Sequence, residues 1–114
     1  MPQLIYLACP YQHSDPAVMQ QRFEQINKIA ATLIANGDFV FSPISHTHPI
    51  GQSGDLPSGW RYWEAYDTRM LCVCDKLVVA MLDGWSMSTG VINEIAIAKR
   101  LDLPIEYLAV TTIL

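Results

Sequence analysis

The sequence is poor in charged residues, and it lacks the long apolar run that would cross a membrane. Only 16% of its 114 residues are charged and 51% are hydrophobic, which indicates a sheet covered on both faces, an interface between subunits, or both. No apolar run approaches the roughly 18 residues of a membrane span, and the first residues lack the basic start of a signal peptide. We therefore expect a cytoplasmic protein that has no membrane partner.

Cysteine and clustered basic residues are also scarce. The three cysteines, Cys9, Cys72 and Cys74, are odd in number and two of them are only two positions apart, which favours buried free thiols over a disulfide framework or a zinc knuckle. The formal net charge is −4 and the Lys and Arg residues are scattered, so the sequence gives no electrostatic sign of a nucleic-acid partner. A small molecule is the better class of partner.

What the sequence does contain is an alternation of strand and helix patterns along one domain, residues 1–114. Four short apolar runs have the composition of buried strands: residues 4–8, 39–42, 76–82 and 104–109. Three longer segments have helical spacing or capping signals: residues 16–35, 59–73 and 88–101. Residues 43–59 are rich in Pro, Gly, Ser and His, and they predict an irregular loop.

This alternation predicts the fold class. Strands joined by helices form parallel sheets with right-handed crossovers, so we expect an α/β, doubly wound (flavodoxin- or Rossmann-like) three-layer sandwich. Its sheet should hold four or five strands in the order 2-1-3-4. Ligands bind where such an order changes direction, which places the expected cleft at residues 9–13 and 83–87.

The segment from Ser88 to Glu94 follows the third predicted strand and begins a helix. Ser88 can cap that helix and offer a hydroxyl to a ligand, while Gly90 lets a ligand approach the backbone closely. Glu94 falls in the first two turns, where the helix dipole favours a carboxylate. The segment is therefore either the seat of a nucleophilic carboxylate or an ordinary capped surface helix.

Two carboxylates interrupt apolar helix faces. Asp67 shares a face with Trp60 and Trp63, and Glu94 lies on the side of its helix marked by Val91. Burial of an unpaired carboxylate raises its pKa, which suits general acid or base work, although hydrogen bonds to a nearby loop could equally hold Asp67. Two carboxyl groups that flank a glycosidic bond can cleave it, so glycosyl transfer or hydrolysis is the leading chemistry.

Several other side chains are candidates for contacts in the cleft. Tyr6, near the end of the first strand, could orient a carboxylate or be an ordinary core tyrosine. Asp83 could contact a sugar hydroxyl or only form a turn, and Trp85 could stack on a planar ligand or cover the core. His46 could belong to a lid or contact a base; together with His48 it lacks a third ligand of known position, so no metal site is expected.

These motifs together resemble the nucleoside 2-deoxyribosyltransferase superfamily. The resemblance rests on Tyr6-Leu7-Ala8-Cys9-Pro10, on Asp67 followed by Asp75, and on Ser88-Thr89-Gly90-Val91 with Glu94, and it covers nearly the whole chain. The serine six residues before the glutamate looks more like the deoxynucleoside 5′-monophosphate N-glycosidase branch than the transferases. The sequence is also similar to a family of small, uncharacterised bacterial and phage proteins assigned to that superfamily.

The resemblance implies roles for particular residues. Glu94 matches the nucleophile, Asp67 the acid/base carboxylate, Tyr6 the tyrosine that positions the nucleophile, and Ser88 the residue that holds the 5′ end of the substrate. It also implies a homodimer or a larger assembly in which a neighbouring subunit completes the pocket. The chemistry needs no cofactor.

The loop after the first strand departs from the monophosphate hydrolases. Pro10 stands at the position of a phosphate-binding serine, and in this loop only His13 offers positive charge. We expect an N-glycosidase or transferase that acts on a nucleoside or a nucleoside 5′-monophosphate. The alternatives are a binding module that keeps the pocket without turnover and an oligomerising structural protein. Trp60 and Trp63 mark the expected subunit interface.

Overall fold

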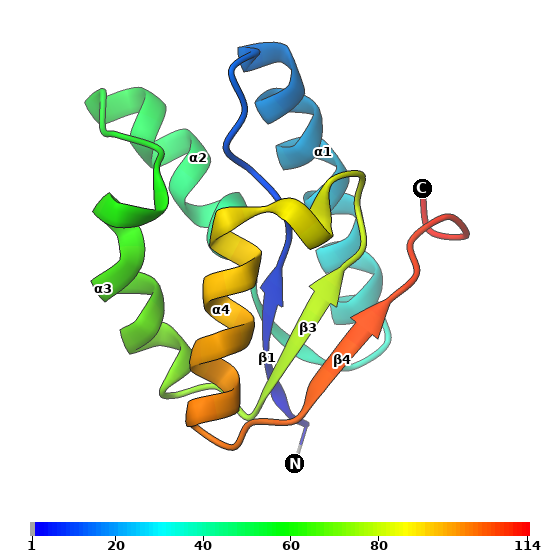
Figure 1. Cartoon of the computed structure of the whole chain (residues 1–114). Coiled ribbons are helices and arrows are strands. Elements are labelled where there is room, and N and C mark those ends of the chain that lie inside the picture. Colours follow the sequence, from blue (N-terminus) through cyan, green and yellow to red (C-terminus); the bar gives the residue numbers. More distant parts are fainter. Residues whose placement is uncertain (1) are drawn as a thin grey trace.

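The computed structural model describes residues 2–114, and a four-stranded parallel sheet forms its centre (Figure 1). The strands are β1 (Leu4–Ala8), β2 (Phe39–Phe41), β3 (Lys76–Ala80) and β4 (Ile105–Leu108). They lie in the order β2-β1-β3-β4, and each neighbouring pair is parallel. The predicted α/β class and strand order are confirmed.

Helices cover both faces of this sheet. They are α1 (Pro16–Ala35), α2 (Pro43–Gly54), α3 (Trp60–Leu71) and α4 (Thr89–Arg100), with a short 3-10 helix, η1 (Trp85–Met87), before α4. Figure 1 shows α3 and α4 on the near side of the sheet and α1 and α2 on the far side. The radius of gyration is 13.1 Å, close to the ~13 Å of a compact domain of about 100 residues.

The sheet divides the apolar core into two clusters because side chains alternate along each strand. Ile5 and Leu7 of β1 face α1, where they pack with Ile26 and other buried residues. Tyr6 and Ala8 face the opposite way, into a cluster with residues of α3 and α4. This alternation directs Tyr6 toward the face that also carries both candidate carboxylates.

The predicted loop over residues 43–59 is wrong for most of its length. Residues 43–54 form α2, which starts with Pro43, a residue whose fixed φ suits the first helical turn. Pro49 lies inside the helix, yet Thr47 and His48 are buried against the rest of the protein. Tertiary packing of this face outweighs the low helix propensity of Pro, Gly and Ser.

The other boundaries differ from expectation by only a few residues. Asp15 caps α1 by accepting a hydrogen bond from the backbone N–H of Ala17 at 2.9 Å, and Gly37 adopts a positive φ of 101° just beyond the helix. Ser58 does not cap α3; its hydroxyl donates to Gln12 at 2.5 Å, and Gly59 occupies the cap position. Of the helices within residues 2–114, none has the length and apolar content needed to cross a membrane.

Candidate functional site

The larger of two neighbouring cavities opens where β1 and β3 end, at the edge of the sheet where the strand order changes direction. Its volume is about 630 Å³. The loop after β1 contributes Cys9 to His13, the loop after β3 contributes Gly84 and Met87, and the start of α4 contributes Ser88 to Gly90. Asp67 of α3 and Glu94 of α4 both line this cavity.

Glu94 is a buried carboxylate in the cavity wall. It lies in the second turn of α4, and only 5% of its surface is exposed. The Tyr6 hydroxyl of β1 donates a hydrogen bond to the carboxylate, and Tyr6 itself is fully buried. A carboxylate held by a buried partner keeps one orientation, which is what a positioned nucleophile requires.

Asp67 is the second buried carboxylate of the cavity, but its surroundings differ. Its exposed fraction is 8%, and the Oδ1 atom has no hydrogen-bond partner among the described residues. The alternative in which loop hydrogen bonds satisfy Asp67 therefore fails for this atom. Burial of an oxygen atom without a hydrogen-bond partner lowers the stability of the folded protein. Such an atom therefore marks a candidate functional group.

Burial changes the pKa of both carboxyl groups. Loss of solvation raises the pKa of Glu94 to about 8; the hydrogen bond from Tyr6 opposes this rise, and the nearby charge of Asp67 adds to it. Loss of solvation also raises the pKa of Asp67 to about 7. The two groups therefore retain at least one proton between them at neutral pH, which gives the cavity both a proton donor and a potential anion.

Cys9 is the other conceivable nucleophile in the wall. It is buried, and burial raises the pKa of its thiol far above the ordinary value. The thiolate is the reactive form of cysteine, so Cys9 is inert at physiological pH. Cys74 is buried like Cys9, whereas Cys72 is exposed, contrary to the expectation that the thiols are buried.

The structure brings four of the predicted binding residues to the cavity and leaves three away from it. Pro10, His13, Ser88 and Gly90 line the wall, and the Ser88 hydroxyl also caps α4 by accepting from the Val91 N–H at 3.3 Å. The three residues away from the wall are Asp83, Trp85 and His46.

Each of these three residues has another role. The backbone carbonyl of Asp83 accepts from Arg22 at 3.2 Å, while Trp85 packs on the core cluster of Tyr6 and lies 5.6 Å from Tyr107 between ring centroids. His46 is exposed and hydrogen-bonded to the Tyr66 hydroxyl at 2.8 Å. Within residues 2–114, no three His, Cys, Asp or Glu side chains are grouped to hold a metal ion.

The chain matches a known protein family over most of its length. The family model described as Domain of unknown function (DUF1937) matches residues 3–109. The chain belongs to this family. No protein of curated function matches the chain. The function must therefore be inferred from the chemistry of the cavity.

The sequence analysis missed two basic residues of the larger cavity. Arg22 of α1 and Arg61 of α3 both line it, and neither forms an ion pair in the described part of the chain. The Arg22 guanidinium donates to the carbonyls of Tyr11 at 3.3 Å, Gln12 at 3.2 Å and Asp83 at 3.2 Å. It thereby joins the loops after β1 and β3. A detectable signal existed, because Arg22 lies on the same helical face as Ile26, which is buried.

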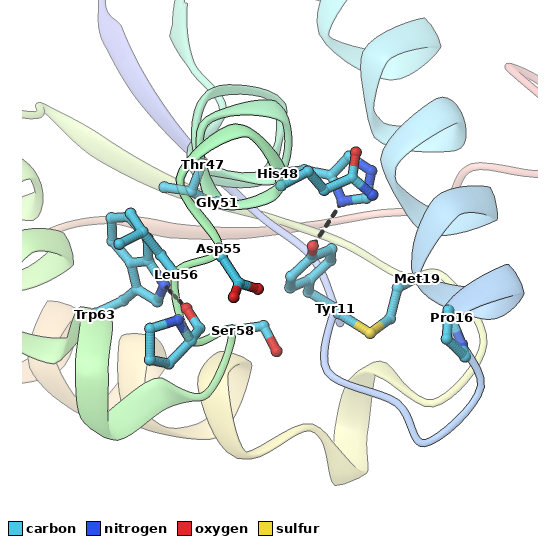
Figure 2. Close-up of a pocket in the computed structure, with 12 residues that line it drawn as sticks. Tyr11, Pro16, Met19, Thr47, His48, Gly51, Asp55, Leu56, Ser58 and Trp63 are labelled. Atoms are coloured by element: carbon cyan, nitrogen blue, oxygen red, sulfur yellow. Dashed lines mark hydrogen bonds between the residues drawn. The ribbon is translucent and has the colours of Figure 1, made fainter.

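A smaller cavity of about 220 Å³ adjoins the larger one (Figure 2). Four residues line both cavities: Tyr11, Thr47, Ser58 and Trp63. Trp63, which the sequence analysis placed at a subunit interface, thus lines both cavities. Trp60 lines the larger cavity and packs on the core cluster of α3 and α4.

Proposed function

We propose that this protein cleaves or transfers the N-glycosidic bond of a nucleoside or nucleoside 5′-monophosphate. The observation that carries the proposal is the pair of buried carboxyl groups, Glu94 and Asp67, in the wall of one cavity. Paired carboxyl groups are what glycosidic cleavage uses, one as the nucleophile and one as the acid. The sequence resemblance to the nucleoside 2-deoxyribosyltransferases assigns the same roles to the same two residues.

The proposed reaction has two steps. In the first, a Glu94 oxygen forms a bond to C1′ while the bond from C1′ to the base nitrogen breaks, and Asp67 gives its proton to the departing base. In the second, water attacks C1′ and releases Glu94, while Asp67 takes the proton of the water. A second base in place of water makes the reaction a transfer.

The hydrogen bonds of the two carboxyl groups support this division of roles. The Tyr6 hydroxyl favours the ionised form of Glu94, because an O–H donor stabilises a carboxylate. Asp67 Oδ1 has no hydrogen-bond donor among the described residues, so no such donor stabilises the ionised form of Asp67 at this atom. Tyr6 is a positioning residue in this account, since it acts on Glu94 and does not line the cavity.

The charge of the cavity supports a phosphorylated substrate. Arg22 and Arg61 add two guanidinium groups to the single histidine, His13, that the sequence suggested for anion binding. Neither arginine is neutralised by a carboxylate within residues 2–114. A guanidinium is the preferred side chain for binding phosphate oxygens. Arg22 and Arg61 thus favour a nucleoside 5′-monophosphate despite Pro10 in the first loop.

One observation favours the alternative, a binding module without turnover. The pKa of Glu94 is raised to about 8, so most of this group is protonated at neutral pH before any ligand is bound. A protonated glutamate is a hydrogen-bond donor and a poor nucleophile. Under the enzymatic proposal the active form has Glu94 ionised and Asp67 protonated, so activity should peak between the two pKa values of about 7 and about 8. A binding module shows no turnover at any pH.

A product assay tests the proposal. The protein is incubated with a panel of nucleosides and 5′-monophosphates, with and without a second free base, and the products are resolved by chromatography. Release of a free base in the parental protein, and its loss in Glu94→Gln, is the expected result. Glu64→Gln is the matched control, because Glu64 lies on the exposed surface of α3. Absence of turnover across the panel, with ligand binding retained, overturns the enzymatic proposal.

A further inference from the structure

The smaller cavity has the position of a compartment for the substrate's base. It shares Trp63 and Tyr11 with the larger cavity, and Trp63 lies one helical turn before Asp67 on α3. A ligand whose sugar lies beside Glu94 and Asp67 could therefore extend past Trp63 into the smaller cavity. Figure 2 shows Trp63 and Leu56 on one side of that cavity and Tyr11 and Met19 on the other.

Hydrogen bonds fix the walls of this cavity. The Trp63 indole N–H donates to the Pro57 carbonyl at 2.7 Å, and the Ser58 hydroxyl donates to Gln12 at 2.5 Å. Tyr11 and His48 are hydrogen-bonded at 2.6 Å between the hydroxyl and Nδ1. The cavity is thus largely formed before a ligand arrives, with an aromatic ring on each side, as a flat heterocycle requires.

The hydrogen-bond network also determines the direction of the Tyr11 hydroxyl. The Gln20 amide nitrogen donates to Glu24 at 2.9 Å, which leaves the Gln20 oxygen to accept from His48 Nε2 at 2.9 Å. His48 Nδ1 must then accept the Tyr11 proton. The hydroxyls of Tyr11 and Ser58 and the indole of Trp63 consequently all donate to protein acceptors, and none of these donors is free for a ligand.

Asp55 is the charged group of this cavity. It ends α2 in the left-handed conformation, with φ 55°, and its carboxylate points into the space between Trp63 and Tyr11 (Figure 2). Asp55 is exposed to solvent at the cavity, so its carboxylate is open to a ligand. An ionised carboxylate offers two acceptor oxygens and no donor, so a ligand that pairs with it must supply the donors.

We propose that the smaller cavity binds the base of the substrate and that Asp55 selects a base edge with two adjacent N–H donors. Among the common bases this is the edge of guanine, with its ring N1–H and its 2-amino group. Adenine and cytosine present an acceptor beside their amino group, and uracil and thymine place one donor between two carbonyls, so a carboxylate repels part of each edge. This inference rests on the proposed function, because it names the base of that nucleoside or nucleotide.

Equilibrium binding of three purines tests Asp55. The probes are the 2′-deoxynucleosides of guanine, hypoxanthine and xanthine and their 5′-monophosphates. The three bases differ only at C2, which carries an amino group in guanine, a hydrogen in hypoxanthine and an oxygen in xanthine. Calorimetry uses Glu94→Gln as the background, so that turnover does not consume the probe. We expect the guanine probes to bind about tenfold tighter than the hypoxanthine probes, as one hydrogen bond to a charged group predicts. The xanthine probes should bind most weakly.

Substitution of Asp55 should reverse this order. Asp55→Asn replaces one acceptor with a donor, so it should weaken the guanine probes by about tenfold and bind the xanthine probes better than the guanine probes. Asp102→Asn is the matched control, because Asp102 is the other aspartate with a positive φ and lines neither cavity. Glycine also tolerates the left-handed backbone at this position. Asp55→Gly should therefore lose the preference for the guanine probes without binding the xanthine probes more tightly.

The outcomes separate this inference from the proposed function. Equal affinity for the three purines, or an unchanged order in Asp55→Asn with an intact circular dichroism melt, overturns the role of Asp55. A guanine preference that depends on Asp55 in a protein without turnover supports Asp55 and contradicts the glycosidase. Turnover by the parental protein, together with a base preference that does not depend on Asp55, supports the glycosidase and contradicts the role of Asp55.

Discussion

At the scale of single residues, the most informative feature is that two carboxyl groups are buried on the same cavity wall at a cost to stability. Glu94 and Asp67 carry raised pKa values because they have lost solvation and only Glu94 has a hydrogen-bond donor in Tyr6. A protein selected only for stability would replace such groups with apolar or amide side chains. The ionisation or substitution of either group should therefore change stability as well as activity.

The first prediction concerns stability against pH. Below about pH 3 both carboxyls are protonated in the folded and unfolded states. As the pH rises toward the folded pKa values of about 7 for Asp67 and about 8 for Glu94, the unfolded state releases protons first, so stability falls. Each group contributes a slope of up to about 1.4 kcal/mol for each pH unit in that window.

Glu94→Gln should remove one of these slopes. Relative to the parent, the variant should gain stability between about pH 5 and about pH 8, as measured by urea unfolding at each pH. The exposed control Glu64→Gln should give a difference that is nearly constant with pH. A pH-independent difference for Glu94→Gln would show that Glu94 ionises normally in the folded protein.

The second prediction tests Tyr6 as a positioning residue. Tyr6→Phe removes the hydrogen bond that lowers the pKa of Glu94, so this pKa should rise further. The optimum of the profile of kcat/KM against pH should move to higher pH, and kcat should fall by more than KM changes. An unchanged pH profile with only a lower melting temperature would mean that Tyr6 serves the core alone.

Arg22 shows what residue patterns could and could not predict. The carboxylates were detectable because each interrupts an apolar helix face, and the same test applied to α1 would have found Arg22. Its hydrogen bonds to Tyr11, Gln12 and Asp83 could not be predicted, because they join loops that are distant in sequence.

At the scale of elements, the strands were predictable and α2 was not. The apolar runs of β1 and β3 are buried on both faces of the sheet, and a continuous hydrophobic run is a strong signal for such strands. In α2, Pro49, Gly51 and Gly54 oppose a helix locally, and the contacts that hold the helix come from elsewhere in the fold. His48, for example, stacks on Phe23 of α1 with a centroid distance of 4.3 Å.

The third prediction concerns the two loops that Arg22 connects. Arg22→Gln should raise the amide hydrogen-exchange rates of residues 9–13 and 83–87, because three hydrogen bonds to their carbonyls are lost. The sheet amides should stay protected, and global stability should fall by roughly 1–2 kcal/mol. Arg61 lines the same cavity but makes none of these hydrogen bonds. Arg61→Gln should therefore leave the exchange rates of the two loops unchanged. Equal exchange in both variants would contradict this role of Arg22.

At the scale of the whole molecule, the apolar composition points to an assembly. The sheet is covered on both faces, so its burial accounts for part of the 51% hydrophobic content. Trp60 and Trp63 line the cavity, but α3 still exposes 51% of Tyr62 and 42% of Tyr66, and Val73 in the turn after α3 is 50% exposed. Tyr62 and Tyr66, four residues apart on α3, form with Val73 an exposed apolar surface that a second copy could cover.

The fourth prediction is therefore a homodimer or larger assembly through α3. Light scattering at high concentration should give a mass above that of one chain, and Tyr62→Glu should shift it to the mass of one chain. Ile34→Glu places the same charge on an equally exposed position of α1 and should not change the mass. A parental protein that is monomeric at every concentration would contradict the prediction.

The proposed mechanism requires that Glu94 forms a covalent bond to the substrate sugar. Rapid acid quench of a reaction with the best substrate of the panel, followed by peptide mass spectrometry, locates that bond directly. We predict that the peptide containing Glu94 gains the mass of one glycosyl group, and that Glu94→Gln neither gains this mass nor releases the base. A glycosyl group on any other residue, or base release by Glu94→Gln at the parental rate, would contradict the account.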